Sequence, residues 1–333
     1  MLDGASLRIW PKVELHCHLD AGVRVATVAE IGRELGLVLP EPLESALVAP
    51  EVCADLADLL SRIDLALEVM QRPQDLSRVT AELIEDMAAD GVVYAEIRFA
   101  PQLHTRRGLS PQQVVETVGK ALRVAGTRHD VDTGLILCCL RHETPAQSRA
   151  VAELAVANRD RVCALDLAGD EGAYPSAAPH REAFALAAEA GLRRTVHAGE
   201  NGGAACVKEA LDLLGAERIG HGVRVVEDAS LVDRAITESV ALEMCPRSNV
   251  QTRAVRSLEA HPIDGLLRRQ ACVTVSTDGR TTCGTSLSGE FERLARQFGW
   301  GRREFMACQL NAAQAAFMPN DMSRWRLIQR LMA

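Results

Sequence analysis

Two histidines, His16 and His18, lie one residue apart near the start of the chain, at the end of the apolar run V-E-L-H-C-H. On a β-strand alternate side chains point to the same face, so both imidazoles would face one way and Cys17 the other. A histidine pair of this kind suits a first-row metal such as zinc. The pair by itself fits two ordinary polar residues at a strand end equally well.

Two further residues complete a candidate metal site. His197 ends an apolar run in T-V-H-A-G-E, and Asp278 ends another in V-S-T-D. Three histidines and one carboxylate form an N₃O donor set that suits zinc and leaves a position for water. Chance rarely places four such residues at the ends of apolar runs. We therefore predict one zinc ion per chain, held by His16, His18, His197 and Asp278.

Three more residues are candidates for acid–base chemistry or its support. Glu200 follows His197 by three residues, and a carboxylate beside a metal is the usual proton carrier in metal-assisted hydrolysis. His221 lies in G-H-G, where glycines allow close approach of the backbone, and its neutral imidazole could orient the attacking water. Glu243, in L-E-M-C-P, could in turn orient His221, or it could be a solvent-facing strand residue.

Eight short β-rich runs alternate with longer stretches of helical spacing. The runs are 12–18, 92–101, 133–141, 163–169, 194–200, 218–222, 240–246 and 272–278. Between them, stretches such as 74–91 repeat apolar residues three and four apart and end in glycine. This alternation predicts an α/β fold, a (β/α)₈ TIM barrel, whose active site is built at the C-terminal strand ends. The candidate residues lie at those ends.

The segment between the first two strands, residues 19–91, is too long for a single helix. We expect it to carry extra helices that cover the mouth of the barrel. No linker rich in Pro, Gly and Ser interrupts the chain, so one domain over residues 1–333 is expected.

Composition narrows the range of partners. Lys and Arg number 37 against 45 for Asp and Glu, and without a basic block nucleic acid is not expected as a partner. No apolar run approaches the ~20 residues of a membrane span, and the N-terminus lacks the pattern of a signal peptide. Ten cysteines without a C-x-x-C pair indicate a reducing compartment. A cytoplasmic protein acting on a small molecule is expected; the oligomeric state is left open.

Several motifs together resemble the adenosine deaminase family. They are H-C-H-L-D, D-L-A-G-D-E, T-V-H-A-G-E, R-I-G-H-G-V, L-E-M-C-P-R-S-N-V-Q-T and S-T-D. The segments E-I-R-F-A-P-Q-L-H-T-R-R-G-L-S and L-I-L-C-C-L-R resemble bacterial members in particular. The resemblance spans nearly the whole chain and rests on the number and order of the motifs. It implies an amidohydrolase-type barrel with one zinc ion and the same four metal ligands.

The resemblance also implies roles for the remaining residues. Glu200 would protonate the purine nitrogen next to the attacked carbon. His221 would hold the attacking water, and Asp278 would accept a hydrogen bond from that water. A metal held by the four ligands would make that water nucleophilic, the water would add to the carbon bearing the amino group, and ammonia would leave. Two further substrate contacts are implied: the Gly169 N–H to a second purine nitrogen, and Asp20 to ribose hydroxyls. His18 is counted among the substrate-binding residues as well as among the ligands.

Two positions depart from the family pattern. The family usually has Asp or Asn after the zinc aspartate, where it hydrogen-bonds the imidazole edge of the purine, but this chain has Gly279. It also reads H-L-D-A-G where the family tends to read H-L-D-G, which places Ala21 after the aspartate. Either a water replaces the lost bond, or the space freed at Gly279 accepts a substituent that aspartate would exclude.

The expected function is therefore zinc-dependent hydrolytic deamination of an aminopurine nucleoside, adenosine to inosine and ammonia, or of a close analogue. One alternative is a different aminated purine: free adenine, a modified adenosine, or a purine with a larger tail. A second is a purine-binding relative without catalysis, against which the intact Glu200, His221 and ligand set argue. A third is an ester or phosphotriester hydrolase, whose sites usually hold two metals bridged by a modified lysine. None of the predicted strands ends in lysine.

Overall fold

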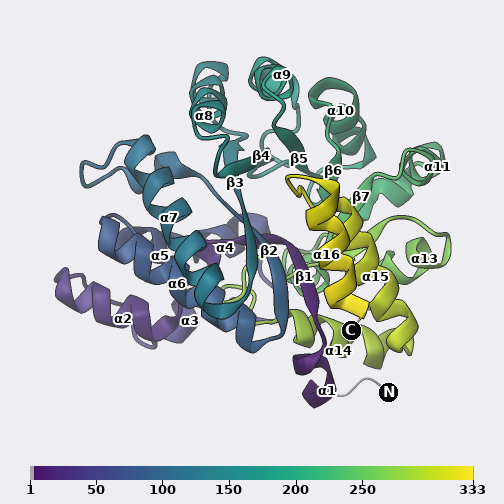
Figure 1. Cartoon of the computed structure of the whole chain (residues 1–333), viewed down its shortest axis with the longest axis horizontal. Helices are drawn as coiled ribbons and strands as arrows, with labels where there is room; N and C mark the ends of the chain where they lie inside the picture. The colour runs from purple at the N-terminus through teal and green to yellow at the C-terminus, as the bar shows by residue number, and fades with distance from the viewer. Residues whose placement is uncertain (1–3, 333) are drawn as a thin grey trace.

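The computed structural model describes residues 4–332, and its strands form one parallel array in the order of the sequence (Figure 1). The strands are β1 (Lys12–His18), β2 (Val92–Phe99), β3 (Asp132–Leu140), β4 (Val162–Ala168), β5 (Arg193–Ala198), β6 (Arg218–His221), β7 (Ala241–Met244) and β8 (Val273–Val275). The ring closes where the Asp278 N–H donates to the His16 carbonyl at 2.9 Å and the His18 N–H donates to the Asp278 carbonyl at 2.7 Å. The predicted (β/α)₈ barrel is confirmed.

Helices lie between the strands and on the outside of the array. They are α1 (Gly4–Ile9), α2 (Val25–Glu34), α3 (Leu43–Leu47), α4 (Leu56–Ser61), α5 (Asp64–Val69), α6 (Pro73–Ala89), α7 (Pro111–His129), α8 (Pro145–Ala157), α9 (Arg181–Glu189), α10 (Ala204–Leu214), α11 (Ala229–Thr237), α12 (Pro246–Gln251), α13 (Ile263–Arg268), α14 (Leu287–Phe298), α15 (Arg302–Ala315) and α16 (Asp321–Met332). Figure 1 shows α8 to α11 in succession around the outside of the barrel.

The helix α7 illustrates how the sequence forms these elements. Ser110 and Gln113 make a capping box, and Pro111 occupies the first turn, where no backbone donor is lost. Val114 and Val118 lie on the buried face at helical spacing. Asp130 ends the helix with a positive φ of 56°.

The last strand is shorter than the run 272–278 predicts, because the chain leaves the ladder before Asp278. The Glu14 carboxylate accepts the Thr277 N–H at 3.1 Å and the Thr277 hydroxyl at 2.8 Å, which replaces ladder hydrogen bonds with side-chain ones. Asp278 itself has a φ of 61°, in the left-handed region. Such strained backbone clusters at functional sites. The turn directs the Asp278 side chain toward the barrel mouth.

The long segment after β1 folds into helices α2 to α6, as expected. Leu56, Leu59 and Leu60 of α4, together with Ile63, line a cavity over the C-terminal strand ends. An apolar cover of this kind excludes water from the site below it. The predicted lid over the barrel mouth is therefore present and is provided chiefly by α4.

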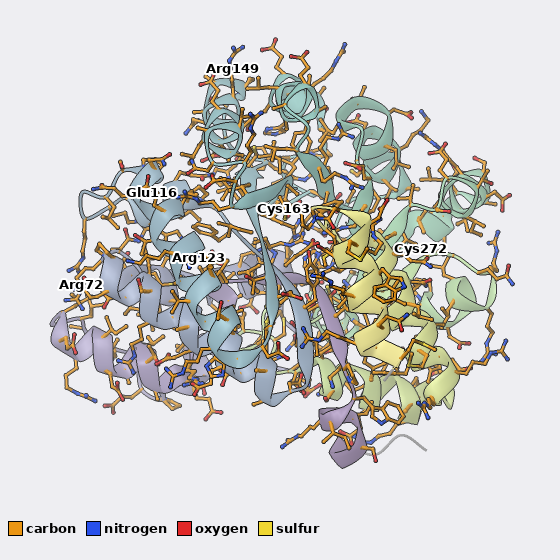
Figure 2. All side chains as sticks on the ribbon, in the orientation of Figure 1. Arg72, Glu116, Arg123, Arg149, Cys163 and Cys272 are labelled. Atoms are coloured by element: carbon orange, nitrogen blue, oxygen red, sulfur yellow. The ribbon has the colours of Figure 1, made fainter. Side chains whose placement is uncertain are left out.

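At the opposite end of the barrel a groove of about 1400 Å³ lies along the N-terminal ends of β3, β4 and β5. Figure 2 labels Glu116 and Arg123 on α7 and Cys163 on β4, three of the residues that line it. None of the candidate site residues lines this groove. Within residues 4–332, no helix combines the length and apolarity that crossing a membrane requires.

Candidate active site

The four predicted metal ligands come together at the C-terminal end of the barrel. One nitrogen or oxygen atom from each of His16, His18, His197 and Asp278 lies within 4.8 Å of all the others. The Nε2 atoms of His18 and His197 are 3.1 Å apart, and His16 Nε2 is 3.5 Å from Asp278 Oδ1. Cys17 packs instead in the apolar core behind the strand, as the alternation of side chains predicts. Three imidazoles and one carboxylate thus face a common point.

The surroundings of these side chains fit a bound zinc ion. His16 Nε2 is buried without a hydrogen-bond partner among the described residues, while its Nδ1 lies 2.8 Å from Glu243. His197 Nδ1 lies 3.0 Å from Asp166. Histidines that bind metals usually donate their other ring N–H to a carboxylate in this way. Burial lowers the pKa of His18 and of His197, which favours the neutral imidazole that a metal requires.

A single arginine holds both of the carboxylates that orient these histidines. Arg98 Nη1 donates to Asp166 at 2.8 Å, and Arg98 Nη2 donates to Glu243 at 2.7 Å. All three side chains are fully buried. Buried charges are tolerated only when they are paired and hydrogen-bonded, so this network resists rearrangement. The guanidinium therefore fixes the two carboxylates, and through them His16 and His197.

Glu243 differs from its expected role. It was expected to orient His221 or to face solvent, but it is fully buried and contacts His16 instead. Its other oxygen accepts from Arg218 Nε at 2.6 Å and from the Thr195 hydroxyl at 3.0 Å. The reason is that Glu243 points into the barrel interior below the strand ends, at the level of the arginines. His221 is the last residue of β6, closer to the mouth.

The partner of His221 is Asn249, a residue that the sequence did not single out. The Asn249 Oδ1 accepts the backbone N–H of Cys245 at 3.3 Å, which turns its amide nitrogen toward His221 Nδ1 at 3.0 Å. His221 Nδ1 must then be an acceptor, so the imidazole proton is on Nε2. Burial lowers the pKa of His221 well below its usual value, in keeping with a neutral ring. His221 Nε2 points toward Glu200 Oε2, 3.5 Å away.

Glu200 is buried beneath the lid, and its Oε1 has no partner among the described residues. Burial raises the pKa of this carboxyl well above its usual value, and the nearby charges of Asp278 and Glu171 raise it further. A neutral carboxyl that lacks a partner can donate a proton to a ligand. The raised pKa keeps Glu200 protonated to a higher pH than an exposed glutamate, which is what a general acid requires.

Glu171 fixes the loop that carries Glu200. Its carboxylate accepts four successive backbone N–H groups at 2.8 to 3.1 Å, those of Gly199, Glu200, Asn201 and Gly202. Arg141 donates to the His197 carbonyl at 2.8 Å and lies 3.5 Å from Glu171. The motif D-L-A-G-D-E contains Glu171, but only its glycine was given a role from the sequence. Its acidic side chain just after a barrel strand is the signal that could have identified it.

The residues expected to contact substrate are distributed unevenly around the cavity. His18, Gly169 and Gly279 line it, with Gly169 at a φ of 110° that favours glycine. Asp20 is buried but is not among the lining residues, and its Oδ1 has no partner among residues 4–332. Burial raises the pKa of Asp20 to about 6.

The place left by the missing side chain at Gly279 is not empty. A Cβ at this position would lie 2.6 Å from the Ala21 Cβ, closer than real side chains approach. The φ of Gly279 lies outside the left-handed region, so contact rather than backbone conformation opposes a side chain here. The Ala21 methyl group therefore occupies the place of the absent Cβ, while Gly279 and Ala21 both line the cavity. That the cavity accepts a larger substituent beside Gly279 stays a prediction. The two departures from the family pattern touch each other.

Comparison with known proteins shows similarity along nearly the whole chain. A family model described as adenosine deaminase matches residues 11–333. An adenosine deaminase of Mycobacteroides abscessus is 41% identical over 344 aligned residues, which cover 96% of this chain and 94% of that protein. The crystal structure of adenine deaminase from Arthrobacter aurescens superposes with a TM-score of 0.91 at 31% identity, over 97% and 98% of the two chains. The N6-methyl-AMP deaminase of Arabidopsis thaliana gives a TM-score of 0.88 at 26% identity, over 99% and 98%.

Proposed function

This chain belongs to the adenosine deaminase family, and on that premise we propose that it is a zinc-dependent hydrolase that deaminates adenosine or a close analogue. The observation that carries the proposal is the position of Glu200, a buried carboxyl with a raised pKa, beside three converging imidazoles and Asp278 in one cavity. Metal-assisted hydrolysis needs a Lewis acid and a proton donor close together. The four proposed ligands and Glu200 follow strand ends that meet at the barrel mouth.

Each residue has a distinct task in the proposed reaction. A zinc ion held by the four ligands would supply the Lewis acidity that makes water nucleophilic at neutral pH. His221 would donate its Nε2–H to the oxygen of the attacking water and so orient it. Ser248 donates to Asp278 Oδ2 at 2.6 Å, which leaves Oδ1 on the side of the histidines. Glu200 would deliver a proton to the purine nitrogen beside the attacked carbon, which makes that carbon more electrophilic.

The identity of the aminopurine is tested on metal-replete enzyme by assaying release of the 6-amino group from a panel, as ammonia or, from an N6-methylated purine, as methylamine. The panel contains adenosine, adenine, N6-methyladenosine 5′-monophosphate and a purine nucleoside with a larger tail. Adenine and N6-methyl-AMP are included because the similar structures from Arthrobacter and Arabidopsis are deaminases of those compounds. Release of ammonia or methylamine from at least one aminopurine is expected. Metal-loaded protein that releases none would overturn the proposal and favour a purine-binding relative without catalysis.

The contact between Ala21 and Gly279 leads to a prediction about both residues. Gly279→Asp alone is expected to lower Tm and to reduce kcat/KM on every substrate, because the new Cβ meets the Ala21 methyl group. The double variant with Ala21→Gly is expected to recover the Tm, because the methyl group is then absent. Thermal unfolding and kcat/KM are measured for the parent, both single variants and the double variant. Equal loss of Tm in the single Gly279→Asp variant and the double variant would show that the two positions are independent.

A further inference from the structure

The wall of the cavity next to Gly279 contains one polar side chain with no assigned task. Thr282 lines the cavity and is 3% exposed. Its Cβ lies 3.3 Å from the position that a Cβ at Gly279 would take. Thr282 therefore stands beside the point from which the side chain that the family usually presents to the purine would extend.

The Thr282 hydroxyl has no hydrogen-bond partner within residues 4–332, whereas its backbone is held firmly. The Thr282 N–H donates to the Ala21 carbonyl at 3.0 Å, and the Thr282 carbonyl accepts the Ala49 N–H at 2.7 Å. Thr282 Oγ1 is not among the fully buried atoms that lack a partner, so the oxygen is accessible and can be satisfied by water or by a ligand. The cavity that this side chain lines offers the space for such a partner.

Resting on the proposed function, we propose that the Thr282 hydroxyl supplies the hydrogen bond to the imidazole edge of the purine that Gly279 cannot make. The atom recognised is the imidazole-ring nitrogen N7, whose lone pair accepts from a hydroxyl. Ala21 supports this arrangement because its methyl group occupies the place of the absent Cβ and its carbonyl accepts the Thr282 N–H. In this chain a threonine hydroxyl, three residues after position 279, thus replaces the carboxylate or amide that the family usually has at that position.

Two ligands that differ at a single atom isolate this contact. Adenosine carries N7, whereas 7-deazaadenosine carries a C–H group at that position and cannot accept a hydrogen bond. Because the two compounds also differ in reactivity, their dissociation constants are compared by calorimetry in metal-loaded Glu200→Gln protein, in which turnover is slow. Adenine and 7-deazaadenine form a second pair for a site that prefers the free base.

The Glu200→Gln protein is expected to prefer adenosine over 7-deazaadenosine by about two- to tenfold, the range of one neutral hydrogen bond. Adding Thr282→Val should bring this ratio to about one, and Thr282→Ser, which keeps a hydroxyl, should retain it. Thr281→Val is the matched control, because Thr281 is the neighbouring threonine and does not line the cavity. The Glu200→Gln protein that also carries Thr281→Val should prefer adenosine over 7-deazaadenosine by the same factor as the Glu200→Gln protein. The ratio of the two dissociation constants does not change when a substitution weakens the binding of both ligands equally. If the Thr282→Val variant is unstable, Thr282→Ala is used in its place.

Unchanged preference for N7 in the Thr282→Val and Thr282→Ala proteins would overturn the assignment of Thr282 and leave the proposed function standing. Equal dissociation constants for adenosine and 7-deazaadenosine in the Glu200→Gln protein with Thr282 intact would also overturn the assignment of Thr282 and leave the proposed function standing. By contrast, metal-loaded parent enzyme that neither binds nor deaminates any aminopurine would refute the proposed function itself, and the role of Thr282 with it.

Discussion

Replacing Glu200 by glutamine is expected to lower kcat about 10²- to 10⁴-fold, the usual contribution of a general acid, while metal content stays at the parent level. Glutamine keeps the size and the hydrogen-bonding reach of the side chain but cannot release a proton at neutral pH. The loop itself should remain in place, because Glu171 holds it through backbone N–H groups. Turnover is measured by ammonia release and metal content by elemental analysis.

The pH dependence gives a second view of the same residue. Burial raises the pKa of Glu200, so its carboxyl stays protonated at a pH where an exposed glutamate is ionised. Proton donation is therefore present below the raised pKa and is lost as the pH rises through it. The kcat of the parent enzyme should therefore fall as the pH becomes alkaline. The residual kcat of the Glu200→Gln variant should not show this fall. Activity within tenfold of the parent would show that another group delivers the proton.

Replacing His197 by alanine is expected to lower the metal content from close to one equivalent per chain and to abolish most of the activity. The reason is that His197 supplies one of the three imidazoles, and its loss also leaves the buried Asp166 without that partner. Elemental analysis of purified protein measures the metal, and zinc is expected to be the element found.

The control for this variant is Cys17→Ser. Cys17 lies between two of the proposed ligands along the chain but packs in the apolar core on the other side of the strand. The Cys17→Ser protein should keep its metal, although the buried serine hydroxyl will lower the stability of the fold. Full activity in protein shown to contain no metal would refute the metal-dependent mechanism.

Much of the architecture is a local property of the sequence. Strand-length apolar runs and helical stretches repeat eight times, so the parallel barrel follows from periodicity and from the right-handed connection of such units. The same pattern placed His16, His197 and Asp278 at strand ends, and the C-terminal ends of parallel strands share one side of a barrel. Because side chains alternate along β1, His16 and His18 point to the same face of the strand and Cys17 points to the opposite face. These conclusions need only the position of a residue along its own strand.

Contacts between strands that are distant in sequence were decided by the tertiary structure. Glu243 contacts His16 rather than His221, because depth along the barrel axis selects its partners and the order of residues does not. Ala21 and Gly279 are separated by most of the chain, yet the closure of β1 onto the segment after β8 brings them into contact. Thr282 acquired a place in the cavity wall by the same closure. A strand period specifies which face a side chain takes, whereas the distance to a side chain on another strand depends on the curvature and stagger of the closed barrel.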